Sequence, residues 1–212
     1  PRDIRNGLAM PPKLSIKNVI QVLKRPEWAL KTLINGQPSF EVLKPYMPKS
    51  LNLKQLAKFM DSTFSGRLNE EKIKKLRDSW RGKLVIKGTE SVHDIEKAHK
   101  LGVDGVIISN HGGRQVDVGQ ASVDSLKTVV PIYKGKLKIM MDSGIRGGAD
   151  VARVLGVGAD FTFLGRSFMY GVSALGSKGG THTVSIIKKQ LKQIMEQLGC
   201  SEIKDFVDTR IY

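Results

Sequence analysis

The chain has 212 residues, 40% of them hydrophobic and 26% charged, which is typical of a globular domain with one sizeable core and excludes a disordered chain. Cys200 is the only cysteine, which excludes a disulfide framework and a cysteine-ligated metal site and favours a reducing compartment. The net charge is +15, and residues 1–60 contribute +8 of it through eleven Lys and Arg residues against three acidic ones. The excess is concentrated in one segment, and anionic lipid attracts such a segment as readily as nucleic acid does. The charge is therefore no specific indication of nucleic-acid binding, and we expect no nucleic-acid partner.

The N-terminal part of the chain has the weakest pattern of regular structure. Proline and glycine predict an irregular lead-in over residues 1–14. Residues 15–34 carry apolar side chains at helical spacing, interrupted at Pro26 and interleaved with lysines, which predicts two short basic amphipathic helices. Such helices either pack on their own domain or lie at a membrane interface. No apolar run reaches the roughly 20 residues of a membrane span, and no signal peptide opens the chain.

The middle of the chain leads into a regular alternation. Residues 35–50 are rich in proline and read as a loop, and helices are expected over 52–60 and 69–80. The later apolar runs predict strands at 84–88, 105–109, 137–141 and 161–164 and helices at 92–101, 123–133, 149–155 and 184–198. This alternation implies parallel strands joined by right-handed crossovers. The predicted fold is therefore α/β, with four βα units that make half of a TIM (β/α)8 barrel, which usually needs about 250 residues.

Polar residues recur where these strands end. Lys87, Ser109, Asp142 and Gly165 follow one another at intervals of 22, 33 and 23 residues, which are lengths of βα units. In such a barrel the carboxyl ends of the strands form the catalytic face. The segment after Ser109 adds a histidine, two glycines and an arginine. These residues suit acid/base chemistry on an anionic substrate, although a glycine turn with a hydrogen-bonded histidine and a solvated arginine has the same pattern.

Residues 109–115, Ser-Asn-His-Gly-Gly-Arg-Gln, resemble the active-site signature of the FMN-dependent α-hydroxy acid dehydrogenase/oxidase family. The resemblance implies that residues 1–212 are the C-terminal portion of a single FMN-binding barrel domain, and that the enzyme oxidises an L-2-hydroxy acid to the 2-oxo acid. Ser143 and the basic connecting segment, residues 13–60, indicate the membrane-associated L-lactate and (S)-mandelate dehydrogenase branch over the glycolate oxidase relatives. Residues 13–60 are then a membrane-contact region.

The same resemblance implies a role for each site residue. His111 is the base and contacts the substrate, and Arg114 binds the substrate carboxylate through its planar fork. Lys87 lies beside the flavin N1–C2 edge, where its charge stabilises the reduced flavin, and Ser109 hydrogen-bonds the ring. FMN phosphate is expected at two loops, which are formed by Asp142, Ser143, Gly144, Ile145 and Arg146 and by Gly165 and Arg166.

Several features remain open at the level of sequence. The electron acceptor is expected to be a quinone or cytochrome, although dioxygen would serve in a soluble oxidase. The pattern also allows a different FMN- or phosphate-binding barrel, or a non-catalytic basic barrel fragment that binds lipid or nucleic acid. The resemblance further suggests a homo-oligomer of the full-length protein, located in the cytoplasm or peripherally on the inner face of the cell membrane. The histidines outside the signature have no spacing typical of a metal site, and we assign none.

Overall fold

The computed structural model describes residues 15–36, 40–47, 53–63, 68–116 and 118–209. By its contacts the chain divides into two compact units, residues 3–67 and residues 68–212, with residues 1–2 assigned to the second unit. The lead-in predicted for residues 1–14 lies outside the described residues.

The first unit is helical. Helix α2 spans Ile16–Leu23 and is capped by Ser15, whose hydroxyl accepts the Asn18 N–H at 3.2 Å. Helix α3 spans Pro26–Asn35, with proline in the first turn, where its missing N–H is no loss. The two predicted helices and the break between them are thus confirmed. Helix α4 spans Leu53–Thr63, and a 3₁₀ helix, η1, spans Glu41–Tyr46 inside the segment predicted as a loop.

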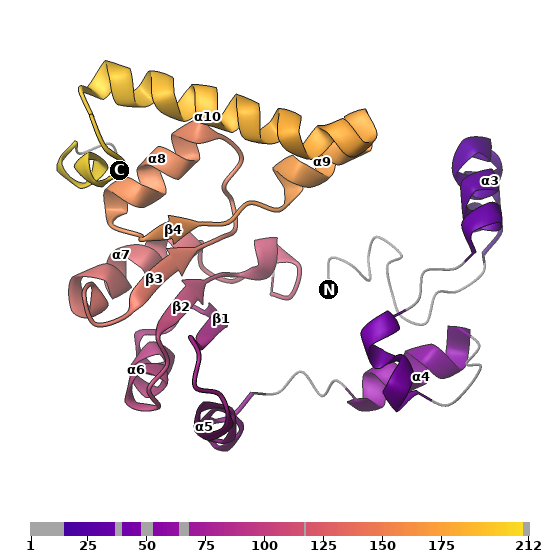
Figure 1. The fold of residues 1–212 in the computed structure, drawn as a ribbon, viewed down its shortest axis with the longest axis horizontal. Coiled ribbons are helices and arrows are strands. Elements are labelled where there is room, and N and C mark those ends of the chain that lie inside the picture. Colours follow the sequence, from indigo (N-terminus) through magenta and orange to yellow (C-terminus); the bar gives the residue numbers. More distant parts are fainter. Residues whose placement is uncertain (1–14, 37–39, 48–52, 64–67, 117, 210–212) are drawn as a thin grey trace. The chain divides into compact units, whose positions relative to one another are not determined.

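The second unit is a four-stranded parallel sheet with helices between the strands, and Figure 1 shows the strands side by side. The sheet order is β1-β2-β3-β4, so each strand pairs with the next one along the chain, as in a barrel wall. Its elements are α5 (Glu70–Ser79), β1 (Val85–Thr89), α6 (Val92–Lys100), β2 (Gly105–Ile108), η2 (His111–Gly113), α7 (Ser122–Tyr133), β3 (Lys138–Met141), α8 (Gly148–Val157), β4 (Phe161–Thr162), α9 (Arg166–Leu175), η3 (Gly176–Lys178), α10 (Gly179–Leu198) and η4 (Ile203–Asp208).

The core lies between the sheet and its helices. Val106 and Ile108 of β2, Ile139 of β3, and Leu126 and Val129 of α7 are completely buried. β-Branched side chains of this kind are favoured on a pleated, buried surface, and the helices cover that surface with their apolar faces. This packing fixes where each strand ends, and therefore where the polar residues that follow it lie.

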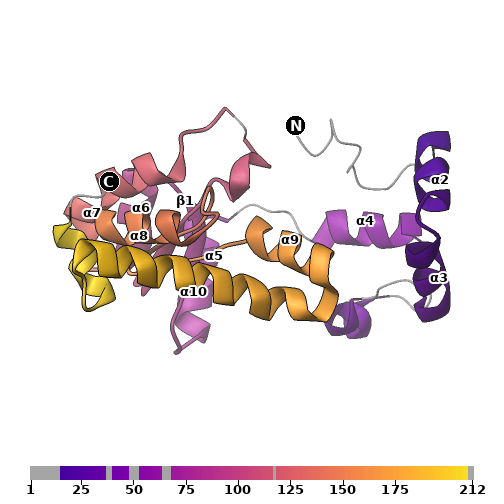
Figure 2. The ribbon, with the colours of Figure 1, turned by 90° about the horizontal axis from the view of Figure 1, so that it is seen from above.

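The last part of the barrel unit differs from the prediction. Strand β4 covers only Phe161–Thr162, α9 was not predicted at all, and α10 begins at Gly179 instead of residue 184. Figure 2 shows α10 running along α8 and α9, with which it makes extensive contacts. Two glycines allow this packing, because a Cβ atom on Gly179 would lie 2.2 Å from the carbonyl oxygen of Gly171.

Candidate active site

Three of the predicted site residues are in direct contact at the carboxyl ends of the strands. The Lys87 ammonium donates to the Ser109 hydroxyl at 2.9 Å and forms an ion pair with Asp142 at 2.7 Å. These residues come from β1, from the end of β2 and from the end of β3, so the parallel register of the sheet brings them together. The Lys87 side chain remains 43% exposed, which leaves its charge open to a ligand.

Asp142 is held in its ionised form. Burial raises its pKa, but hydrogen bonds from Lys87, Ser109 and Ser143, together with the charge of Lys87, outweigh burial and bring the pKa below the ordinary value of an aspartate. The Ser143 hydroxyl donates to the second carboxylate oxygen at 2.9 Å. The carboxylate therefore fixes both a cation and a hydroxyl at the edge of the site.

His111 lies directly over β1. Gly88 has a φ of +95°, and the pairing of β1 with β2 shifts between Lys87 and Thr89, which is an irregularity typical of a β-bulge. A Cβ atom on Gly88 would lie 2.8 Å from Cε1 of the His111 ring. Glycine is thus required at residue 88, because any side chain there would displace the imidazole that the sequence predicts to be the base.

The loop that carries His111 is fastened to the neighbouring strand ends. The His111 N–H donates to the Ser109 hydroxyl at 3.2 Å, and the Gly112 N–H donates to the Ser143 hydroxyl at 3.0 Å. The Arg166 guanidinium donates to the Gly112 carbonyl at 2.7 Å. Arg114 follows as an exposed residue whose N–H donates to the His111 carbonyl at 3.4 Å. Residues expected to hold FMN therefore also hold the loop with the base.

The two predicted phosphate loops lie next to each other, since the Ser167 hydroxyl donates to the Arg146 carbonyl at 2.8 Å. Ser143 and Gly144 have φ values of +76° and +79°, so the backbone turns sharply after β3. Ile145 is 3% exposed, and its side chain belongs to the core. Only the backbone of Ile145 could therefore face a cofactor.

The two helix N-termini at these loops differ in their capacity for an anion. Asp150 accepts the N–H groups of Arg146 and Gly147 at 2.8 and 3.3 Å, so a carboxylate already caps α8. Helix α9 has no acidic residue in its first turn, and a Cβ atom on Gly165 would meet nothing within 4 Å. Because first-turn amides have no intrahelical acceptor, the end at Gly165 and Arg166 suits a phosphate better. Cations, hydroxyls and open glycine backbone thus fit a flavin phosphate.

The sequence did not single out two residues that support this site. The Ser122 hydroxyl accepts the Asn110 N–H at 3.0 Å and donates to Glu90 at 2.9 Å. Ser122 is the first residue of α7, so its signal in the sequence was that of an ordinary helix start. Nothing in the spacing of Glu90 indicated that its carboxylate reaches α7.

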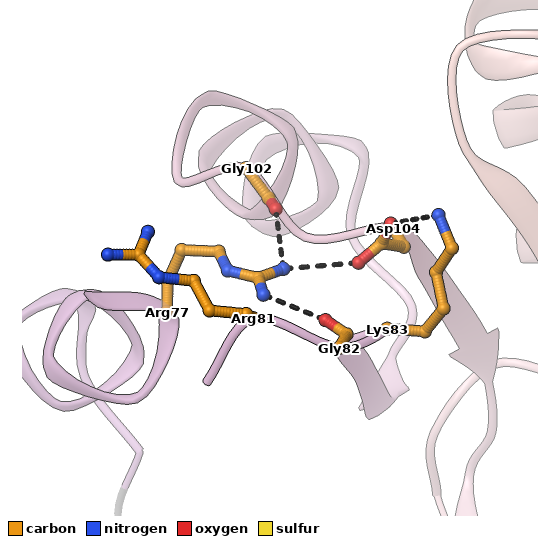
Figure 3. A pocket seen from close by; sticks show the side chains of 6 residues that line it. All are labelled: Arg77, Arg81, Gly82, Lys83, Gly102 and Asp104. Carbon is orange, nitrogen blue, oxygen red and sulfur yellow. Dashed lines mark hydrogen bonds and ion pairs between the residues drawn. The ribbon is translucent and has the colours of Figure 1, made fainter. Parts of the chain in front are cut away.

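A separate pocket of about 430 Å³ is drawn in Figure 3. Several of its lining residues directly precede β1 and β2, so it lies at the opposite ends of these strands. Arg77 of α5 lies at its centre and donates to the carbonyls of Gly82 and Gly102 and to the Asp104 carboxylate, which also pairs with Lys83. The Arg81 side chain points away from Asp104. Because the Arg77 guanidinium is fully engaged with the protein, this cluster joins α5 to the sheet, and the candidate active site is the other rim.

The geometry defines half of an α/β barrel with a cationic, hydroxyl-lined rim suited to a phosphate-bearing cofactor and an anionic substrate. The chain belongs to the FMN-dependent dehydrogenase family, whose model matches residues 1–212. This confirms the family predicted from residues 109–115, and with it FMN as the cofactor of the family.

Individual relatives agree with this family. The chain is 34% identical over 205 residues to an L-lactate dehydrogenase of Vibrio parahaemolyticus, covering 96% of this chain and 54% of that protein. It is 35% identical over 195 residues to an L-lactate dehydrogenase of Haemophilus influenzae, covering 92% and 51%. The crystal structure of the monotopic membrane protein (S)-mandelate dehydrogenase superposes with a TM-score of 0.87 at 31% identity, covering 98% and 55%. The chain thus spans about half the length of these relatives, which agrees with the predicted partial barrel.

Proposed function

We propose that this chain forms the catalytic half of an FMN-dependent enzyme that oxidises an L-2-hydroxy acid of the lactate or mandelate type to the 2-oxo acid. The observation that carries the proposal is the cluster of Lys87, Ser109 and Asp142, to which the backbone of His111 is hydrogen-bonded through Ser109. A cation, a hydroxyl and an imidazole thus belong to the same rim. Relatives named for L-lactate and (S)-mandelate support this substrate class.

The chain's own residues would divide the chemistry between them. His111 takes a proton from the substrate, since an imidazole nitrogen can act as a general base. Arg114, three residues further along the same loop, binds the substrate carboxylate with two parallel hydrogen bonds. Since both side chains are exposed, they are accessible to a small acid.

The flavin would be held by groups at the same rim. FMN, when bound, would supply the acceptor for the two electrons that leave the substrate. Lys87 and Ser109 would hold its ring. Two sets of residues would hold its ribityl phosphate, namely Asp142, Ser143, Gly144, Ile145 and Arg146 after β3 and Gly165 and Arg166 after β4. The Lys87 ammonium, which its ion pair with Asp142 keeps in place, would supply positive charge next to the flavin ring.

The experiment uses the full-length protein. We expect it to purify yellow and to bleach anaerobically on addition of L-lactate or L-mandelate. His111→Gln should lower kcat by about 10² to 10⁴-fold, the usual contribution of a general base, while the flavin is retained. Arg114→Met should raise KM, whereas Arg153→Met, which removes an exposed arginine of α8, should not. A colourless protein, or an Arg114→Met variant with unchanged KM, would refute the proposal.

We further propose that the electrons pass to a quinone or cytochrome at the membrane, with residues 13–60 as the contact region. Ile16, Leu23, Leu33 and Ile34 of α2 and α3 are each more than 70% exposed, and lysines lie between them. This arrangement is typical of an interfacial helix pair. None of the helices in the described ranges has the length and apolarity needed to span a bilayer. The likeness to a monotopic membrane protein supports peripheral attachment. We place this attachment on the cytoplasmic face as part of the same proposal.

The acceptor and the assembly can be tested separately. Reduction of a quinone analogue without oxygen consumption is the result we expect, and rapid oxygen consumption would assign a soluble oxidase of the glycolate oxidase type. A colourless protein that still bound anionic vesicles would be a lipid-binding barrel. We also propose that the full-length protein is a homo-oligomer, which sedimentation of the purified enzyme would test.

A further inference from the structure

His111 has an unfavourable backbone conformation. Its φ is +55°, a left-handed value that side chains with a Cβ atom seldom adopt outside sites where the surroundings impose it. The residues on both sides of it are held by hydrogen bonds to side chains. On one side, Ser143 and Arg166 fix the Gly112 peptide groups; on the other, Ser122 fixes the Asn110 N–H. The loop conformation therefore depends on these partners.

The hydrogen bond from the Asn110 N–H to Ser122 is one of two consecutive hydrogen bonds whose donors and acceptors are defined. Ser122 is 3% exposed, and its hydroxyl accepts the Asn110 N–H at 3.0 Å. A hydroxyl has a single proton, and here the proton goes to Glu90 Oε1 at 2.9 Å. Because Glu90 Oε1 accepts this proton, Glu90 orients the hydroxyl so that its lone pair faces Asn110. This series of hydrogen bonds thus runs from Glu90, which directly follows β1, through Ser122 at the start of α7 to Asn110, the residue before His111.

Asn110 transmits this constraint into the loop. Its side-chain oxygen accepts the Gly113 N–H at 3.3 Å, and its side-chain nitrogen donates to the Gln120 carbonyl at 3.2 Å. With the backbone bond to Ser122, Asn110 closes both ends of the turn that contains His111. A shift of Asn110 would move the imidazole away from Gly88, over which it now lies.

We propose that Glu90 and Ser122 are positioning residues for His111, acting through the Asn110 backbone. This inference rests on the proposed role of His111 as the base. Neither residue touches the imidazole, so their effect is on its location. Displacing a reacting group by about 1 Å can cost about 10²-fold in rate, which makes such an anchor visible in kinetics.

The test compares three variants of the full-length enzyme. Ser122→Ala removes the whole connection, Glu90→Leu removes the acceptor that orients the hydroxyl, and Glu90→Gln keeps an acceptor oxygen in the same place. Ser125→Ala is the matched control, because Ser125 is a 2% exposed serine one turn further along α7. Hydrogen exchange of peptides covering residues 105–116 reports the loop directly, and steady-state kinetics with L-lactate or L-mandelate report the base.

We expect Ser122→Ala and Glu90→Leu to speed exchange of these peptides about fivefold, as loss of one hydrogen bond would. They should lower kcat by roughly 10- to 100-fold, with a smaller change in KM and full flavin content. Glu90→Gln should restore both readouts, and Ser125→Ala should change neither. Unchanged exchange in Ser122→Ala, or a Glu90→Gln variant as impaired as Glu90→Leu, would overturn the inference. If the parent enzyme fails to oxidise either acid, the proposed function falls, while the exchange data still decide whether the anchor exists.

Discussion

The two units of this chain use amphipathic helices in opposite ways. In residues 68–209, helices such as α7 bury their apolar faces on a parallel sheet, and Leu126 and Val129 are completely buried. In the other unit, α2 and α3 show the same helical spacing of apolar residues, but neither helix contains a buried residue. Periodicity therefore specifies a helix with an apolar face, whereas burial requires a second apolar surface. Among the described residues, the strands provide that surface in one unit only.

We expect the greatest loss of folding stability from truncating a side chain in the core. Leu126→Ala should lower the free energy of unfolding by about 2–5 kcal/mol, because it removes buried methyl groups and leaves a cavity. Leu33→Ala in α3 makes the same chemical change at a side chain that is 84% exposed. This variant should change the free energy of unfolding by less than about 0.5 kcal/mol. Urea unfolding of both variants is the measurement. Equal losses would mean that α3 is buried in the complete protein, and the contrast between the units would disappear.

A second effect should separate the two units by their charge. Lys17, Lys24 and Lys31 are exposed on α2 and α3, and each lysine near an anionic surface contributes about 1 kcal/mol, or roughly fivefold in binding. Replacing all three by Gln should therefore weaken partition of the full-length protein onto anionic vesicles by roughly 100-fold. The matched control is the triple Gln variant of Lys188, Lys189 and Lys192, which are exposed on α10. Equal losses in the two triple variants would remove the membrane role from residues 13–60.

A smaller effect is expected on the pH dependence of folding stability, to which ion pairs contribute. Hydrogen bonds from Lys83 and from the Leu84 N–H lower the pKa of Asp104 to about 2, from 3.8. A pKa that is lower in the folded state contributes stability above pH 3.8, and this contribution is lost as the pH falls toward 2. Asp104→Asn should be less stable than the parent at pH 6. The difference in free energy of unfolding between the two proteins should become smaller by pH 2.5.

The helical unit offers the control for Asp104. Glu27 also has a lowered pKa, caused by its hydrogen bond and ion pair with Lys31, but both side chains are at least 70% exposed. Solvent screens such pairs. Between pH 6 and pH 2.5, the free energy of unfolding of Glu27→Gln should therefore change with pH in nearly the same way as that of the parent. Urea midpoints across this range test both variants, and an Asp104→Asn curve parallel to the parent would show that the Arg77–Asp104–Lys83 cluster adds nothing to folding.

The sequence determined much of this protein by local pattern. Apolar runs at βα spacing were enough to predict four parallel strands, and the contiguous signature at residues 109–115 identified the family, which the comparisons confirm. Helix α9 was not predicted, although Gly171 inside it and Gly179 of α10 permit the close approach of the two helices. A local pattern does not reveal which backbone a glycine faces.

The contacts between the site residues could not be predicted from local pattern and depend on the folded structure. The ion pair of Lys87 with Asp142, the approach of Gly88 to His111 and the chain from Glu90 to Asn110 join residues that lie on different strands and loops. Such contacts depend on strand register and on the geometry of each turn, and these are set by packing of the whole sheet and its helices. Residue types and their order therefore determined the chemistry available at the rim, while the fold fixed which of those groups touch.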